Sequence, residues 1–565
     1  MDNLKRDFKS TLDKMFENNL ADFSAPQKDK QKVLIALTNG KKRASTFVGV
    51  GNTIRTAFEA AKAKAVKSVL GENAAPRWVY MAFVSDEESM PLKDFYEDIG
   101  RTKKHYYRKG WALDNLYQFA FLEQEVNGAG LIKYNEKNKI TLHDHNMTAL
   151  LRYKKLIGGQ MVFSQKMIEE VITFRTKSCF FDVAEGAYYD LYDEGLEKGI
   201  RIFEQLDADS LTALVKLSGQ YLKDTVLDDG RLVYGYFPVF DREIPTYNAI
   251  RHCLSVMAFM DIYNLTGDES YKEVIKKSYR YILDTCVIAV DEETAVVVDK
   301  DNDNEIRLGA LGLTIIMILM YADIFGTNED LDRAVQIGNA ICRLQDERGQ
   351  FTHVLSYPDL SVKDQFRIVY YSGEACYGLM SLYVRTKDEK YLGIVKKAFD
   401  FFIAEKYEKY FDHWLSYAVN ELTRYAPEDR YFEFGLKNAT NQIDFITQRL
   451  TTWPTFLELI NAAFTMIERI KELGRDDLLS NYPIDKFYDA VSVRLFRQLN
   501  GVLFPEMAMF YQNPERMLYG VFIRHHYFRV RDDDVAHHLI GYCHFIKNVL
   551  PYYPDGKICR IRVEG

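Results

Sequence analysis

The chain has 565 residues, of which 73 are Lys or Arg and 81 are Asp or Glu, so its formal net charge is −8, and 47% of the residues are hydrophobic. This composition excludes a disordered chain and, with 32 Gly and 13 Pro, a fibrous or low-complexity one. A mildly acidic protein has no general electrostatic attraction to nucleic acid, so we expect no nucleic-acid partner.

Residues 1–30 are predicted to form an N-terminal helix. Charges run through this region without the apolar segment of a secretory signal, so we expect no such signal. The cysteines are scattered and form no Cys-x-x-Cys pair, which is typical of reduced thiols. The longest nearly uncharged stretch, Leu308 to Ala322, is shorter than the ~20 residues that span a bilayer and predicts a buried helix. We therefore expect a cytoplasmic protein without a membrane span.

A small α+β domain is predicted over residues 31–150. Two β-rich runs, Val33–Thr38 and Ser45–Val50, flank an Asn-Gly turn signal and indicate a hairpin. Helical spacing of apolar residues follows over Thr53–Leu70, and Arg77–Val84 has the pattern of a further strand. Residues 151–206 mix short strands and helices and form a connecting region.

From residue 207 to 555 the sequence predicts a repeated pair of helices. Tight loops separate the two helices of each pair, and an acidic residue opens the second helix, where the helix dipole favours negative charge. These loops lie at residues 265–269, 326–329, 386–389, 426–429 and 474–477. The second helices carry charge on one face and are predicted to be outer helices, whereas the first helices are more apolar and are predicted to be inner helices.

Each predicted inner helix begins with a cluster of polar residues. Six such starts occur, at Thr246–His252, Glu305–Gly309, Tyr370–Glu374, Phe411–Trp414, Thr451–Thr455 and Arg529–Asp534. Six apolar helices, each joined to an outer helix, are expected to pack as a ring within a ring. A helix over residues 208–226 is predicted to close the circle as the outer partner of the sixth inner helix.

This rhythm, together with the segment SGEACYGLMSLYVRTKDEKYL at residues 372–392, resembles the six-hairpin (α/α)6 toroid superfamily. That superfamily includes glycoside hydrolases, N-acylglucosamine 2-epimerases and glucuronyl C5-epimerases. The resemblance implies a mainly α fold, an (α/α)6 toroid with a small N-terminal α+β domain. It also implies that the active cleft lies where the inner helices begin.

Six converging helix N-termini would make an electropositive mouth that suits an anionic or polyhydroxylated ligand. Arginines add bidentate donors for a carboxylate, and aromatic rings offer stacking faces. We therefore expect a carbohydrate substrate, especially an acidic sugar. The candidate substrate-binding residues are Tyr247, Asn248, Arg251, His252, Arg307, Tyr371, His413, Trp414, Trp453, Arg529 and Arg531.

Four residues are candidates for catalysis: Glu374, Asp412, Asp533 and His537. Glu374 lies in the first turn of a very apolar helix, where burial would raise the pKa of its carboxyl toward that of a general acid. Asp533 and His537 are four residues apart and can share one helix face. Glycoside hydrolysis by two carboxylates is the leading hypothesis.

Two other functions stay open. Histidines and tyrosines at the helix starts could move protons in a sugar epimerase, in which arginines hold the substrate. A toroid without an acid–base pair could instead be a non-catalytic sugar-binding or scaffold protein whose N-terminal domain recruits a protein partner. Ordinary helix capping also explains Glu374, Asp412 and the three aspartates at Asp532–Asp534. We expect no cofactor, since dinucleotide and Walker A motifs are lacking. We also expect no metal, because capping and a solvated acidic turn explain Asp532–Asp534, although the spacing of Asp533 and His537 would permit a metal site.

Overall fold

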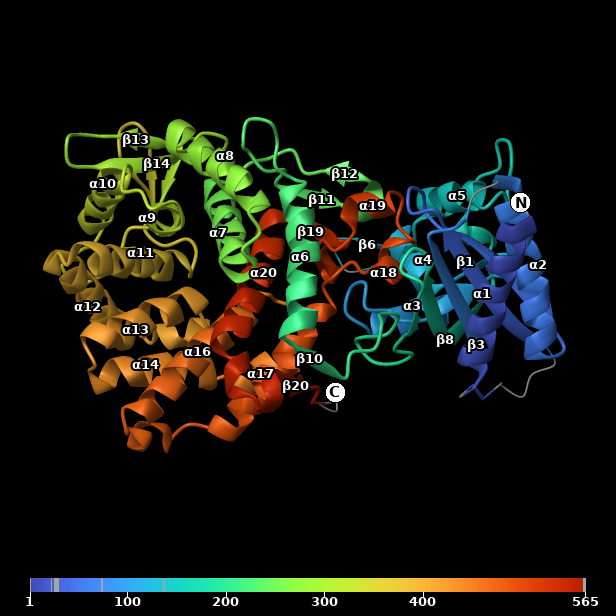
Figure 1. The fold of residues 1–565 in the computed structure, drawn as a ribbon. Coiled ribbons are helices and arrows are strands. Elements are labelled where there is room, and N and C mark those ends of the chain that lie inside the picture. The colour runs from blue at the N-terminus through green and yellow to red at the C-terminus, as the bar shows by residue number, and fades with distance from the viewer. Residues whose placement is uncertain are drawn as a thin grey trace. The chain divides into compact units, whose positions relative to one another are not determined.

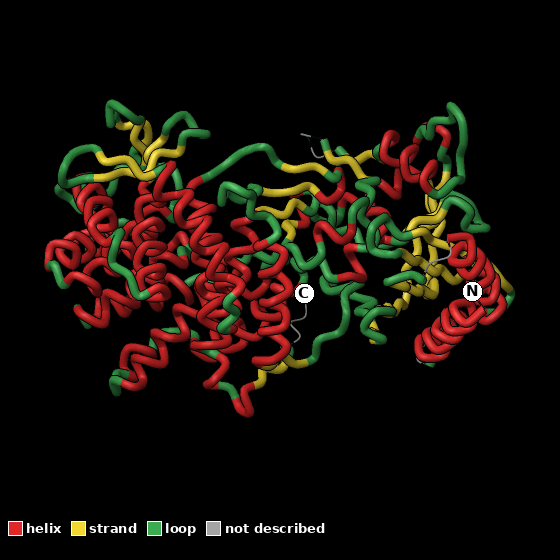
Figure 2. Tube along the Cα trace, turned by 45° about the horizontal axis from the view of Figure 1, so that its top comes forward, coloured by secondary structure: helices red, strands yellow, loops and turns green. Residues whose placement is uncertain are grey.

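The fold is that of a computed structural model, which describes residues 2–21, 23–24, 30–72, 75–135, 137 and 139–561. It consists of two compact units (Figures 1 and 2). Unit 1 comprises residues 1–203, 236–242 and 500–530, and unit 2 comprises residues 204–235, 243–499 and 531–565. The sequence predicted one continuous segment, 207–555, for the helical part, whereas the structure gives two stretches of that segment to unit 1.

Unit 1 is built on a seven-stranded sheet with the strand order β2-β1-β3-β8-β4-β5, in which β9 also pairs with β8. The predicted hairpin is confirmed, because β1 and β2 pair antiparallel from Gln31↔Gly51 to Leu37↔Ser45. The strands are β1 (Gln31–Thr38), β2 (Ser45–Gly51), β3 (Trp78–Pro91), β4 (Gly110–Ala112), β5 (Ala120–Phe121), β8 (Glu170–Asp182) and β9 (Ala187–Asp190).

Both faces of this sheet are buried, which explains why β1 is buried along its whole length and apolar from Val33 to Leu37. On one face, Val33 and Ile35 pack with the helices α1 (Asp2–Leu20) and α2 (Ile54–Glu72). On the other face, Leu34 and Ala36 pack with Met509 and Phe510 from residues 500–530.

Residues 500–530 belong to unit 1 because their side chains complete its core. Besides Met509 and Phe510, the buried carboxylate of Glu506 binds the Arg201 guanidinium at 2.8 Å. Sequence periodicity could not reveal that residues 500–530 belong to unit 1, because this assignment depends on contacts between residues about 300 positions apart. The smaller elements of unit 1 include α3 (Leu92–Gly100), α4 (Glu123–Gly128), β6 (Ile132–Tyr134), β7 (Ile140–Leu142), α5 (Asp144–Tyr153), α18 (Pro505–Ala508), α19 (Pro514–Met517) and β18 (Phe522–Ile523).

Unit 2 is a closed ring of six inner helices. Each inner helix packs against the next one, and the last packs against the first. In ring order the inner helices are α7 (Ala249–Thr266), α9 (Leu308–Phe325), α11 (Tyr371–Thr386), α13 (His413–Tyr425), α16 (Thr455–Glu472) and α20 (Asp532–Asn548). All six begin at or within a few residues of the predicted starts.

Six outer helices surround this ring, each packed on the inner helix of its own pair. They are α8 (Ser270–Thr285), α10 (Leu331–Arg343), α12 (Glu389–Ala404), α14 (Asp429–Thr440), α17 (Ile484–Leu499) and α6 (Ala208–Lys223). The sequence predicted that a helix over residues 208–226 closes the circle. This prediction is confirmed, because α6 contacts both α20 and α7. Two short hairpins, β13-β14 (Val287–Ala289, Ala295–Asp299) and β16-β17 (Val354–Ser356, Val362–Asp364), join through β15 (Glu305–Arg307) into one small sheet.

The most apolar inner helix, α9, contains the predicted buried stretch. Among the described residues it alone is long and apolar enough to cross a membrane by length and composition, with a mean hydropathy of 2.1. In the structure 78% of this window is buried inside the protein, as expected for a core helix with neighbours on every side.

Helices α9 and α11 approach so closely that their contact requires glycine. A Cβ atom on Gly312 would lie 2.3 Å from the carbonyl oxygen of Glu374, and one on Gly378 would lie 2.8 Å from the carbonyl oxygen of Gly312. The obstructing atoms belong to the backbone and cannot rotate away. This contact fixes where the first turn of α11, and with it Glu374, lies in the ring.

We expect Gly312→Ala to destabilise the protein by about 1–3 kcal/mol, because the two helices must separate to admit the methyl group. The matched control is Gly393→Ala on the exposed side of α12, where an added Cβ meets nothing within 4 Å. That change should stabilise the helix by ~0.5–1 kcal/mol. Calorimetric unfolding of the full chain tests both, and an unchanged midpoint for Gly312→Ala would show that the contact is loose.

Candidate active site

The inner helices run parallel, so their polar N-terminal ends gather at one end of the ring. Gly309 faces Tyr371 and Glu374, and Gly312, one turn later on α9, faces Glu374 and Ala375 on α11. Residue numbers therefore increase in the same direction along the contact in both helices, so α9 and α11 run parallel. The alternation of inner and outer helices extends this parallel arrangement around the circle.

At this end of the ring an aspartate lies between two arginines. The Arg251 Nε donates to Asp533 Oδ2 at 2.7 Å, and the Arg531 Nε lies 3.1 Å from Asp533 Oδ1. Burial alone raises the pKa of Asp533, but the two guanidinium groups outweigh it and hold that pKa below its usual range. Asp533 is therefore a carboxylate at neutral pH. Arg531 also binds Asp534 at 3.0 Å, and Arg251 donates to the Tyr234 hydroxyl.

Glu374 is buried in the wall between two helices. Its side chain occupies the notch left by Gly309, and the residue is only 4% exposed. Burial raises the pKa of Glu374 to about 8, as the sequence predicted, and its Oε2 atom has no hydrogen-bond partner. The carboxyl is thus a neutral acid within the core at pH 7.

Asp412 serves as the N-cap of α13. Its Oδ1 accepts a hydrogen bond from the backbone N–H of Trp414 at 2.8 Å, and its backbone carbonyl accepts one from the Asn438 side chain. The residue is completely buried, and burial raises the pKa of Asp412 well above its usual range. This geometry matches the capping interpretation that the sequence left open.

Two histidines and a glutamate meet in the ring interior. The His537 Nδ1 donates to Glu458 Oε1 at 2.6 Å, and the rings of His537 and His413 have centroids 5.2 Å apart. Burial lowers the pKa of His537, but the neighbouring Glu458 and Asp533 outweigh it and raise that pKa above its ordinary value. His413 Nδ1 lies 3.8 Å from Asp412 Oδ1, too far for a hydrogen bond, and burial together with the nearby His537 lowers the pKa of His413 well below the ordinary value.

A hydrogen-bonded chain continues from this cluster toward the C-terminal half of the ring. The Tyr417 hydroxyl donates to Glu458 Oε2 at 3.1 Å and lies 3.4 Å from His544 Nδ1. The other ring nitrogen of His544 lies 3.3 Å from Asp261 Oδ2. Burial lowers the pKa of His544, but Asp261 outweighs this and raises it above its ordinary value. Both ring nitrogens thus face acceptors, as an imidazolium requires.

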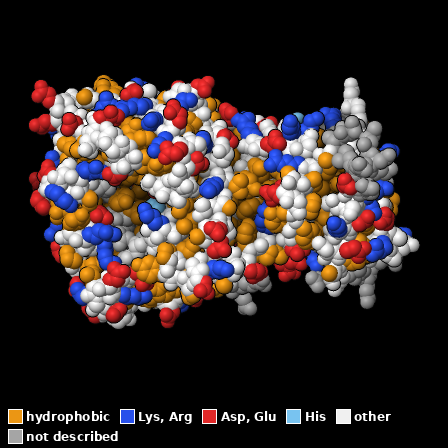
Figure 3. Space-filling model, in the orientation of Figure 1, with side chains coloured by type: hydrophobic (Ala, Val, Ile, Leu, Met, Phe, Trp, Pro, Cys, Tyr) orange, Lys and Arg blue, Asp and Glu red, His pale blue; other side chains and the backbone are white. Residues whose placement is uncertain are grey.

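His544 and Asp261 lie in the wall of a cavity of about 330 Å³ inside unit 2. Five inner helices line this cavity, mainly through their middle and C-terminal turns. The polar and aromatic lining residues are Asp261, Asp323, Tyr377, Ser381, Arg385, Trp414, Tyr417, Glu421 and His544. Figure 3 shows that the surface of unit 2 is hollowed on one face, with hydrophobic, basic and histidine side chains around the hollow.

This cavity does not lie where the inner helices begin, so the predicted cleft at the helix starts stays a prediction. Of the fifteen predicted site residues, all within the described part of the chain, only Trp414 lines the cavity. At the helix starts polar side chains bind one another, as Asp533 binds Arg251 and Arg531. The physical reason is mutual neutralisation, since the arginines and carboxylates at the starts bind one another.

Several predicted substrate-binding residues face other parts of unit 2. The Tyr247 hydroxyl lies 3.2 Å from His252 Nδ1, and His252 Nε2 lies 2.9 Å from the Ser278 carbonyl oxygen on the outer helix α8. Both side chains are therefore directed between α7 and α8. Arg307 is 8% exposed and binds two protein carboxylates, Glu305 at 2.7 Å and Asp299 at 3.1 Å.

The remaining predicted binding residues also have structural contacts. Asn248 caps α7 by accepting the Arg251 backbone N–H at 3.3 Å. Tyr371 is 6% exposed and its ring packs on the His353 ring, with centroids 5.6 Å apart. Trp453 stacks on Phe456 with centroids 5.2 Å apart.

One predicted residue, Arg529, belongs to unit 1. It begins β19 (Arg529–Arg531), where it pairs with Ile523 of β18. The division between the two units therefore falls between Arg529 and Arg531, two residues that the sequence placed in one site.

Sequence reasoning missed Glu458, Tyr417, His544 and Asp261. A signal existed for Glu458, because it is the fourth residue of an apolar inner helix, the same place that Glu374 has in α11. The other three lie beyond the helix starts, where no polar cluster marks them.

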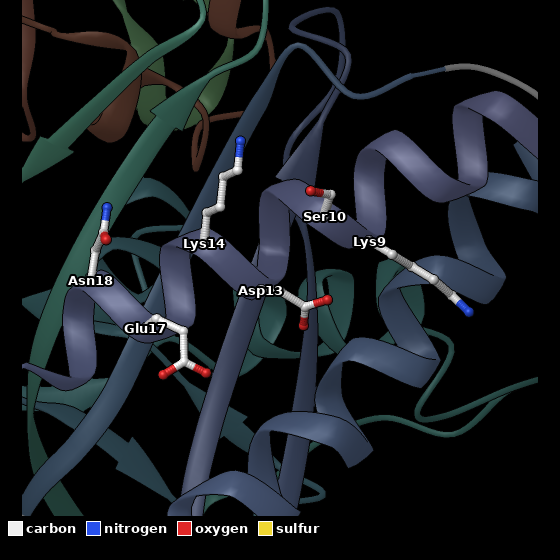
Figure 4. A pocket seen from close by; sticks show the side chains of 6 residues that line it. All are labelled: Lys9, Ser10, Asp13, Lys14, Glu17 and Asn18. Carbon is white, nitrogen blue, oxygen red and sulfur yellow. The ribbon is translucent and has the colours of Figure 1, made fainter.

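A shallow depression on unit 1 has a different character. It is lined by Lys9, Ser10, Asp13, Lys14, Glu17 and Asn18, all from the single helix α1 (Figure 4). Most of these side chains are exposed, and Asp13 is paired with Lys62 of α2 at 2.5 Å. One helix surface with solvated charges provides no enclosed site.

Comparison with known proteins finds similarity only among solved structures. No family model and no curated protein matches the chain. The cellobiose 2-epimerase of Bacillus thermoamylovorans is 12% identical, with 60% of this chain and 100% of that chain covered and a TM-score of 0.46. D-mannose isomerase is 12% identical, with 60% and 97% covered and a TM-score of 0.44.

An inactive variant of the α-1,6-mannanase of Salegentibacter sp. was solved in complex with an α-1,6-linked mannose tetramer. It is 13% identical to this chain, with 59% of this chain and 98% of that chain covered and a TM-score of 0.40.

Proposed function

We propose that the chain is a carbohydrate-active enzyme that moves a proton at a sugar carbon next to a carbonyl group, the chemistry of sugar epimerases and isomerases. The observation that carries this proposal is the His544–Asp261 pair in the cavity wall, with Tyr417 on the other ring nitrogen. Histidine is the commonest side chain for such proton transfer.

The cavity lining supports a polyhydroxylated ligand. Its volume of about 330 Å³ lies within the range of small-molecule sites, ~300–1,000 Å³. Tyr377, Trp414 and Tyr417 form an aromatic cluster with ring centroids 5.6–6.2 Å apart, suited to the apolar face of a sugar ring. Asp323, paired with Arg385, and Ser381 offer hydrogen bonds to hydroxyl groups.

The proton-transfer step follows from the contacts of His544. The carboxylate of Asp261 orients the ring through Nε2 and favours the imidazolium. A sugar carbonyl oxygen that takes the place of the Tyr417 hydroxyl, 3.4 Å from Nδ1, can receive the proton of that nitrogen. The neutral imidazole then accepts the proton that leaves the adjacent carbon. One proton joins oxygen and one leaves carbon, so the resulting enediol forms without an oxidant. Delivery of a proton to the same carbon from its opposite face, by a second acid or by His544 after the enediol turns over, inverts that carbon, and return of the proton to the neighbouring carbon isomerises the sugar.

Glycoside hydrolysis is the second candidate, favoured by the carboxylates of the cavity. Asp261 on α7 and Glu421 on α13 come from helices three places apart in the ring of six, and both line the cavity. Two carboxyl groups on opposite sides of a glycosidic bond are what hydrolysis requires. Glu374 and Asp412, which the sequence favoured for this chemistry, do not line the cavity. Hydrolysis in this cavity would therefore depend on Asp261 and Glu421 instead.

A substrate panel in D2O distinguishes these functions. Uptake of deuterium at a sugar carbon by free aldoses, uronic acids or N-acylhexosamines indicates proton transfer, whereas new reducing ends from oligosaccharides indicate hydrolysis. We expect His544→Gln to lower turnover about 10²–10⁴-fold, the usual contribution of a general acid–base, with little change in binding. Asp261→Asn should lower it less, because the imidazole remains.

The control is His538→Gln, a buried histidine on the same helix that does not line the cavity. It should keep its activity. Sugar binding by calorimetry without any turnover would support a binding protein instead, and full activity of His544→Gln would remove the proposed acid–base residue.

The raised pKa of His544 predicts a pH-dependent contribution to stability. A histidine whose folded-state pKa exceeds its unfolded value, ~6.5, stabilises the fold below that pH and loses this effect as the pH rises through the folded-state pKa. Besides Asp261, the charges that act on His544 are Glu458 and, with opposite sign, Lys547.

We therefore expect Asp261→Asn to destabilise the protein by about 1–2 kcal/mol at pH 5.5 and by clearly less at pH 9. Calorimetric unfolding of the full chain at both pH values measures this difference. An equal loss at both would mean that Asp261 acts through packing and not through the imidazolium.

A further inference from the structure

We propose that His413, Glu458 and His537 bind one divalent transition-metal ion inside the ring of unit 2, with Zn²⁺ as the preferred ion. One ligand atom from each side chain lies within 4.8 Å of the other two. The three residues come from α13, α16 and α20, which are consecutive helices of the ring. The site lies outside the cavity wall, and the proposal does not depend on which sugar reaction the chain catalyses.

The chemistry of the three ligands suits zinc. Two imidazole nitrogens and one carboxylate oxygen are a zinc ligand set that leaves one coordination position open. Ligand atoms about 2.0–2.1 Å from a tetrahedral ion lie roughly 3.3 Å from each other. The ligand atoms, which now lie within 4.8 Å of one another, therefore need to move by no more than ~1.5 Å relative to one another, which side-chain rotation can supply. The hydrogen bond of 2.6 Å between His537 and Glu458 already brings two ligands together.

The unsatisfied state of His413 points to a missing partner. The residue is 1% exposed, and neither of its ring nitrogens has a hydrogen-bond partner. An unpaired polar group buried in the core is costly, and native proteins seldom keep one without a reason. Packing provides no hydrogen-bond partner, because the neighbours of the His413 ring are the rings of Tyr370, Trp414, Tyr417 and His537. A metal ion between His413 and the His537–Glu458 pair would use one of these nitrogens.

The surroundings of the three ligands favour a cation. Tyr417 donates to the Glu458 oxygen that His537 does not use, which fixes the carboxylate as outer hydrogen bonds do in metal sites. Glu374 Oε2 and Asp412 Oδ2 are buried nearby without hydrogen-bond partners. Glu374 interacts electrostatically with His537, and Asp412 Oδ1 lies 3.8 Å from His413 Nδ1. A divalent ion nearby would favour the charged forms of these two acids, which burial alone disfavours.

His538 provides a matched comparison within the same helix. It too is 1% exposed and lacks partners for both ring nitrogens. It is not part of any group of three candidate ligands among the described residues, and its ring packs on Tyr542 with centroids 4.5 Å apart. An orphaned histidine alone therefore does not define the site; the convergence of three ligands does.

The test titrates the metal-stripped full chain with CoCl2 and ZnCl2. We expect one ion per chain by calorimetry, visible absorption of the Co²⁺ form typical of four or five ligands, and a rise in unfolding temperature with Zn²⁺. His537→Gln and Glu458→Gln should weaken binding at least 100-fold. Tyr417→Phe should weaken it ~10–100-fold, as loss of an outer hydrogen bond does.

His538→Gln should bind the metal as the wild type does. Circular dichroism and the unfolding temperature of each metal-free variant show whether the fold is intact, and the two ligand variants act as independent tests should one fail to fold. Absence of stoichiometric binding by the wild-type chain would overturn the proposal. Equal affinities of His537→Gln, Glu458→Gln and His538→Gln would also overturn it, whatever the outcome of the sugar assays.

Discussion

Closure of the six inner helices into a ring is the constraint on which the rest of unit 2 depends. Once α20 packs against α7, every inner helix has neighbours on both sides and an outer helix behind it. Side chains on the inward face then contact only one another or the small central cavity. Charged groups in such a place must be paired or must change their protonation, because burial strongly disfavours an isolated charge. The electrostatics of the interior follow from this geometry.

The two halves of the ring meet this constraint differently. At the N-terminal end, Arg251 and Arg531 neutralise Asp533, while Glu374 and Asp412 are kept as neutral acids by burial. Toward the C-terminal end the walls open into a cavity whose charged groups keep partial access to solvent, as His544 does. The hydrogen-bonded chain through Glu458 and Tyr417 connects the two halves. A proposed proton-transfer site and a proposed metal site thus share a continuous polar core.

The close contact of α9 and α11 determines how narrow that polar core is between these two helices. Glycines on both helices let the backbones approach to a distance that any side chain would prevent. The first turn of α11 is thereby drawn toward the ring interior, so that Glu374 lies against Gly309 and beside the His537 cluster. A wider spacing between α9 and α11 would admit water to Glu374. Without burial, the pKa of its carboxyl would no longer be raised.

The sequence by itself determined the helix pairs, the six inner starts, the closing role of α6 and the hairpin of unit 1, because all of these follow from local periodicity and turn residues. The tertiary structure alone decided which polar residues meet. Glu458 and His537 are 79 positions apart, and Tyr417 and His544 are 127 apart, so their contacts depend on how each helix is rotated about its axis within the closed ring. The same rotation turns Tyr247 and His252 toward α8. The transfer of residues 500–530 to unit 1 likewise depends on core packing, which no local pattern encodes.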